Sequence, residues 1–144
     1  MRRTTFIGIT LIALAGPVVS QLAFTADAGP APAFKAHALT RPELDALLAT
    51  PEKVLIIDVR RPDELTAIGG FPVYLSIQLA DLENKLAFIP KDRQIVTVSN
   101  HAARAGKAAD LLASKGFKVA GAVGAQTYEA DGGTLLHITP PPPK

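Results

Sequence analysis

Residues 95–109, which read IVTVSNHAARAGKAA, place an apolar run, a short loop and an alanine-rich segment in direct succession. The pattern predicts a buried strand over 94–98, a loop over 99–103 and a helix over 104–115 that is closed by Gly116. A strand, loop and helix in this order direct backbone N–H groups and the positive end of the helix dipole at one point. The segment therefore predicts an α/β unit with a candidate anion-binding loop.

The rest of the chain repeats this alternation of short apolar runs and helical segments. Residues 54–57 form a second continuous apolar run, which is typical of a strand buried on both faces of a parallel sheet. Thr40 and Glu43 have the spacing of a capping box and precede an apolar helical face. The other predicted elements are a turn opened by Pro62, a short helix over 81–86, a weaker strand over 118–122 and a strand or helix turn at 135–138. We therefore expect one α/β domain with a mainly parallel central sheet flanked by helices.

The first 28 residues have the pattern of a secretory signal peptide. Two arginines follow Met1, a mostly apolar stretch covers 6–24, and an A-x-A pattern ends at Ala28. We expect cleavage after Ala28 and a periplasmic or secreted location. A membrane anchor is disfavoured because Gly16 and a proline interrupt the stretch, and the paired arginines leave general and twin-arginine export open.

Changes in composition divide the remaining chain. Residues 29–38 are predicted to be a linker that includes a possible first strand, and residues 39–139 to be the folded domain. The sequence PPPPK at 140–144 is expected to be an extended, proline-rich tail.

Charge and cysteine content exclude several classes of function. The 144 residues carry 15 Lys and Arg against 13 Asp and Glu, with no basic run, which argues against electrostatic binding to nucleic acid. The chain has no cysteine, so disulfides, thiolate metal sites and cysteine-based covalent chemistry are excluded. The histidines match no metal-ligand spacing, and neither a metal nor a cofactor is expected. These histidines are His37, His101 and His137.

A second charged segment follows the first predicted strand. Residues 58–64 read DVRRPDE and stand where the sites of α/β proteins collect. Arg60 and Glu64 are four residues apart, a spacing that allows a pair across one helical turn, while composition alone favours a solvated, charged helix start. Further motifs follow in order: G-x-x-P at 69–72, I-P-K-D-R at 89–93 and R-x-x-K-A-A-x-x-L-x-x-x-G-F at 104–117.

This series of motifs resembles the rhodanese-like domain, a sulfurtransferase module, over about residues 39–132, with Tyr128 in a weaker closing motif. Rhodanese-like enzymes carry sulfane sulfur as a persulfide on the cysteine of a C-x-x-x-x-R loop, whose amides hold the sulfur and the substrate anion. Aligned on Arg104, that cysteine position falls on Ser99. The loop implied by the resemblance consists of Ser99, Asn100, His101, Ala102, Ala103 and Arg104, with Asp58, Arg60 and Glu64 as a supporting shell.

Serine cannot replace the cysteine in this chemistry. An unassisted alcohol is not appreciably ionised near neutral pH and has no sulfur to extend, so Ser99 cannot form a stable persulfide. No catalytic residue is therefore assigned. Three further departures from the family pattern also argue against catalysis. Asn100 stands where the family often has Arg or Lys, Ala102 falls at the loop glycine, and Gly70 replaces the histidine of G-H-I-P.

The leading hypothesis is an exported, non-catalytic rhodanese-like domain that binds a small oxyanion or an exported protein, with neither nucleic acid nor membrane as partner after signal cleavage. Two enzymatic alternatives remain open. One is a sulfurtransferase subunit that works through a partner's cysteine, and the other is a serine hydrolase built on Ser99 and His101. The simpler role for Ser99 is a hydroxyl bonded to backbone amides or a helix cap. Phe88, Leu111 and Phe117 are predicted to be core residues without a function.

Overall fold

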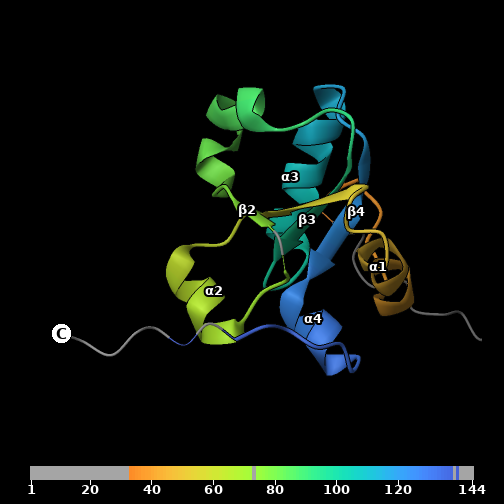
Figure 1. Cartoon of the computed structure of the whole chain (residues 1–144). Coiled ribbons are helices and arrows are strands. Elements are labelled where there is room, and N and C mark those ends of the chain that lie inside the picture. The colour runs from red at the N-terminus through yellow and green to blue at the C-terminus, as the bar shows by residue number, and fades with distance from the viewer. Residues whose placement is uncertain (1–32, 73, 138, 140–144) are drawn as a thin grey trace, which may run out of the picture. The chain divides into compact units, whose positions relative to one another are not determined.

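The computed structural model describes residues 33–72, 74–137 and 139 of the chain (Figure 1). The predicted signal peptide and proline-rich tail lie outside these residues, as does part of the linker. Within the described ranges, no helix combines the length and apolar character needed to cross a membrane.

A parallel sheet forms the centre of the domain. In the described part of the chain it has four strands in the order β2-β1-β3-β4. The strands are β1 (Val54–Asp58), β2 (Tyr74–Ser76), β3 (Gln94–Ser99) and β4 (Val119–Gly124). All three strand pairings are parallel, which confirms the predicted mainly parallel sheet. The two central strands come from the continuous apolar runs, because only a strand buried on both faces needs an unbroken run.

Helices precede, connect or follow these strands. They are α1 (Arg41–Leu48), α2 (Pro62–Ile68), the 3₁₀ helix η1 (Leu79–Phe88), α3 (Ala103–Ser114) and α4 (Ala125–Ala130). Helix α1 begins as predicted, since the Thr40 backbone N–H and hydroxyl both donate to the Glu43 carboxylate at 2.8 Å. Gly116 follows α3 with a φ of +82°, which confirms its role at the helix end.

Two apolar layers pack against opposite faces of the sheet. One contains Leu44 of α1 and Tyr128 of α4 with Ile56 of β1. The other contains Leu82 of η1 with Ile57 of β1 and residues of α3. Figure 1 shows α3 beside η1, with α1 and α4 apart from them across the sheet. Neighbouring residues of β1 thus enter different layers, as the alternation of side chains in a strand requires.

The prediction that Phe88 is a core residue is wrong, because its side chain is 73% exposed. Phe88 is the last residue of η1, and the chain turns from helical to extended backbone at Ile89. That turn buries Ile89 instead, while Phe117 is buried as predicted and Leu111 is partly buried.

Single bridges occur at the two ends of the described chain. Ala38 forms an isolated parallel bridge with Ala122, at the place where the sequence left a first strand open. Leu136 forms an isolated antiparallel bridge with Gly70, so the segment before residue 138 contributes one bridge and no named strand.

Candidate functional site

The loops that follow β1 and β3 meet at the carboxyl edge of the sheet. The two strands are parallel neighbours with Asp58 opposite Val98. The Val59 backbone N–H donates to the Val98 carbonyl at 3.0 Å, so the contact continues past the end of β1. Both segments that the sequence singled out, 58–64 and 99–104, therefore lie side by side.

Arg60 and Asp58 form a buried ion pair. Nε of Arg60 donates to Oδ1 of Asp58 at 2.9 Å and Nη2 donates to Oδ2 at 2.7 Å. The same Nη2 also donates to the carbonyl of Gly69 at 2.8 Å. Both residues are almost fully shielded from solvent, with 1% and 2% exposure. Each charge is thus held in the interior by the other and by backbone.

Arg60 does not pair with Glu64, the partner that the spacing allowed, and the favoured interpretation of a solvated segment is wrong for Arg60, which is buried. Helix α2 begins at Pro62, so Arg60 precedes the helix and the four-residue helical spacing does not apply to it. Its side chain turns back toward Asp58 instead, which leaves Glu64 for another partner.

Glu64 connects the two loops. Its carboxylate accepts from Nη1 and Nη2 of Arg104 at 2.9 and 2.6 Å, and from Nδ2 of Asn100 at 2.7 Å. The Arg104 guanidinium, together with the backbone N–H of Arg61, lowers the pKa of Glu64 from 4.5 to about 2. The same contact raises the pKa of Arg104. The carboxylate is therefore ionised over the physiological pH range and holds two side chains of the β3 loop.

Asn100 lies between the two ion pairs. Its Oδ1 faces Nη1 of Arg60 at 3.5 Å, a long contact, while its Nδ2 binds Glu64. Its backbone carbonyl accepts from the N–H of Gln126 at the start of α4 at 3.2 Å. Asn100 therefore bridges Arg60 and Glu64 through its side-chain amide. An Arg or Lys at this position would place a positive charge beside Arg60.

Ser99 is fully buried, and its hydroxyl is bonded to the backbone of its own loop and of the first turn of α3. The hydroxyl donates to the carbonyl of His101 at 3.2 Å and accepts from the N–H of Ala105 at 3.0 Å. Ala105 lies in the first turn of α3, so the hydroxyl satisfies one of the unpaired amides at that helix start. This is the simpler role that the sequence suggested for Ser99.

The geometry does not assemble a serine–histidine pair. The His101 side chain is exposed, and within the described residues its ring makes no hydrogen bond to Ser99. Because the hydroxyl proton is directed at a backbone carbonyl, no imidazole is in place to remove it.

Unpaired backbone donors remain in the loop. Within residues 33–72, 74–137 and 139, the N–H groups of Asn100, His101, Ala102 and Arg104 have no hydrogen-bond acceptor. The N–H of Ala103 bonds to the carbonyl of His101. Such donors at the start of a helix are the groups that stabilise anions in other α/β proteins.

Gly124 is a positioning residue that the sequence analysis missed. A Cβ at this position would lie 2.9 Å from the backbone N of Ala102 and 3.1 Å from the carbonyl O of Asn100. The end of β4 therefore lies so close to the loop that a side chain at position 124 would push the two backbones apart. The available signal was a glycine that ends an apolar strand directly before a helix.

No metal centre is assembled in the described ranges, which contain no group of three or more His, Asp or Glu residues able to hold an ion. The histidines lie apart and are exposed, with His37 near Glu43 and His137 near Glu129.

Comparisons with known proteins bear on the same segments. The rhodanese-like domain family matches residues 40–133. A sulfurtransferase of Allochromatium vinosum is 34% identical over 74 residues, which cover 51% of this chain and 68% of that protein.

Solved structures show a similar fold. A rhodanese-related protein from Thermoplasma volcanium aligns with a TM-score of 0.60 and 20% identity, over 72% of this chain and 98% of its own. A thiosulfate sulfurtransferase from Pseudomonas aeruginosa aligns with a TM-score of 0.59 and 25% identity, over 71% of this chain and 20% of its own.

Proposed function

The chain belongs to the rhodanese-like domain family, and we propose that it is a member without sulfur-transfer chemistry whose loop 99–104 binds a small oxyanion. The proposal includes export to the periplasm or the exterior, on the strength of the N-terminal sequence pattern.

The unpaired N–H groups of the loop carry this proposal. Among the residues that the structure describes, four backbone donors have no acceptor at the start of α3, a helix of 12 residues whose dipole adds to their effect. The guanidinium of Arg104 contributes little further attraction because Glu64 already binds it through two N–H groups. The expected affinity is therefore weak, with a dissociation constant of about 1 mM, or about 4 kcal/mol of binding free energy.

The absence of catalysis follows from the chemistry required of position 99. Transfer from thiosulfate needs a nucleophile that takes the outer sulfur, releases sulfite and keeps the sulfur as a persulfide. Ser99 has no thiol, and the chain contains no cysteine that could take its place. The serine hydrolase alternative lacks support because His101 is not directed at the Ser99 hydroxyl.

An NMR titration tests the binding proposal. Thiosulfate and sulfate are added to ¹⁵N-labelled protein, with chloride at equal ionic strength as the control. We expect saturable shifts of the amide signals of residues 100, 101, 102 and 104, with a midpoint of about 1 mM. If these signals stay fixed up to about 50 mM oxyanion, or move equally with chloride, the loop does not bind oxyanions.

The export proposal has a separate test. The full sequence is expressed in a Gram-negative host, the periplasmic fraction is isolated, and the intact mass of the protein is measured. We expect a chain that begins at Gly29, whereas a chain that keeps its first 28 residues and stays in the cytoplasm would contradict export.

A further inference from the structure

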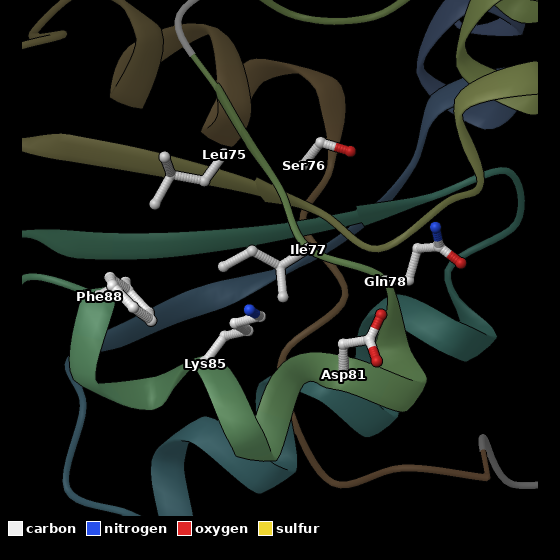
Figure 2. A pocket seen from close by; sticks show the side chains of 7 residues that line it. All are labelled: Leu75, Ser76, Ile77, Gln78, Asp81, Lys85 and Phe88. Atoms are coloured by element: carbon white, nitrogen blue, oxygen red, sulfur yellow. The ribbon is translucent and has the colours of Figure 1, made fainter.

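A groove of about 370 Å³ lies between β2 and η1 and shares no residue with the two loops of the candidate site. Leu75 and Ile77 line it from the strand side, and Lys85 and Phe88 line it from η1 (Figure 2). The groove is open at the surface, where Phe88 is 73% exposed. An exposed aromatic ring beside partly buried aliphatic side chains is the composition of a surface that binds a partner.

The backbone beside this groove belongs to an unpaired sheet edge. In the described sheet β2 has β1 on one side and no strand on the other. The Ile77 N–H donates to the carbonyl of Asp58 at 3.0 Å, so Leu75 and Ile77 direct their backbone groups at β1. Ser76 lies between them and directs its N–H and carbonyl outward, where they have no acceptor or donor among the described residues.

The groove also carries one acidic and one basic side chain. Asp81 and Lys85 are both exposed, and neither forms an ion pair within the described part of the chain. The ammonium of Lys85 lies 5.6 Å from the centre of the Phe88 ring. A groove of mixed charge fits a partner that presents the same two charges in reverse order.

We propose that the occupant of this edge is a second copy of the same chain, related by a two-fold axis. A two-fold interface brings the same patch together from both molecules, so each patch has to be complementary to itself. Ser76 meets this condition, because a residue opposite its own counterpart in an antiparallel pair exchanges two N–H···O bonds. The charges meet it as well, since Lys85 of each copy then faces Asp81 of the other.

The size of the interface sets its strength. β2 has only three residues, and the groove is short, so the buried area falls below that of a standard stable interface. The dimer is therefore transient, with a dissociation constant on the order of tens of micromolar.

Sedimentation equilibrium over about 10 µM to about 1 mM protein tests this proposal. The protein is purified from cells that express the full sequence. We expect the dimer fraction to rise across this range in the wild type. D81K and K85E should each weaken association about tenfold, because each places like charges opposite one another twice per dimer. The combination D81K/K85E reverses both charges and should restore association to within about threefold of wild type.

Lys91 provides the matched control. It is an exposed lysine whose ammonium lies 5.2 Å from the centre of the Phe117 ring, outside the groove. K91E changes the net charge by the same amount as K85E and should leave association unchanged. The proposal is overturned if the wild type stays monomeric over the whole range, if K85E and K91E act alike, or if D81K/K85E is no better than either single variant.

Discussion

The loops that follow β1 and β3 lie side by side, yet different contacts hold them. After β1, the ion pair of Asp58 and Arg60 is complete within its own segment, buried and closed by the carbonyl of Gly69. After β3, the Ser99 hydroxyl bonds to the backbone of His101 and to that of Ala105 in the first turn of α3. The side chains of Asn100 and Arg104 are held by Glu64, a residue of the other loop.

The residues that hold the two loops together are therefore different from the residue at which the chemistry of the family takes place. The β1 segment supplies Asp58, Arg60 and Glu64, and among the described residues none of these side chains bonds to the Ser99 hydroxyl. The chain belongs to the rhodanese-like domain family and has a serine at the position where the resemblance places the cysteine of the family.

Removal of Arg60 should have the largest effect. Arg60→Met leaves the buried Asp58 carboxylate without its cationic partner and, among the described residues, with only the backbone N–H of residue 60 as a donor, which should lower the free energy of unfolding by roughly 3–5 kcal/mol in urea denaturation. Arg61→Met is the matched control, because the neighbouring Arg61 pairs with Asp63 at the surface. Its unfolding should match wild type within error, and equal losses in the two variants would show that the buried Asp58–Arg60 pair has no special role in stability.

Gly124→Ala should displace the β3 loop. The added methyl group meets the backbone of Ala102 and Asn100, and overpacking of this kind costs about 1–3 kcal/mol. The amide signals of residues 100–102 should shift in NMR spectra. Gly116→Ala is the comparison. A methyl group at this position meets no other atom, but the φ of +82° disfavours any residue with a Cβ, so the variant should lower the stability of the protein without moving those signals. Unchanged loop signals in Gly124→Ala would contradict the close approach.

Glu64→Gln should weaken the connection between the loops by about 1–2 kcal/mol near neutral pH, because a charge-assisted contact to Arg104 becomes a neutral one. The pKa of Glu64 is lowered from 4.5 to about 2, so its contribution is complete above pH 4.5 and is lost as the pH falls toward 2.

Urea denaturation at a series of pH values measures this effect. The stability gap between wild type and Glu64→Gln should close over the window from pH 4.5 to 2. Asp63→Asn, at an exposed pair in the same helix, should show little difference from wild type at neutral pH. A gap that stays constant with pH would show that the Glu64 carboxylate is not the stabilising group.

Much of this arrangement is visible in the sequence. Strand and helix positions agree with prediction to within a residue or two for β1, β3 and α3, because their burial and helix-end signals are local. The meeting of segments 58–64 and 99–104 also follows, because adjacent parallel strands end at one edge.

The remaining contacts depend on tertiary geometry. The partner of Arg60 does not follow from helical spacing, because Arg60 lies two residues before the first residue of α2. The bond from Asn100 to Glu64 joins residues 36 positions apart, and no local pattern signals it. The close approach of Gly124 is likewise set by where β4 ends against the loop, which sequence spacing does not reveal.

The most direct test of the account places a sulfur atom at position 99. Wild type and Ser99→Cys are incubated with thiosulfate, their intact masses are measured, and cyanide is then added to detect thiocyanate. In the variant, the thiolate takes the outer sulfur of thiosulfate as sulfite leaves, and cyanide removes that sulfur and restores the thiolate. We predict that Ser99→Cys gains the mass of one sulfur atom and forms thiocyanate, while wild type does neither. Sulfur transfer by wild type, or a variant that never forms the persulfide, would contradict the claim that the missing thiol at position 99 is what prevents sulfur transfer at this loop.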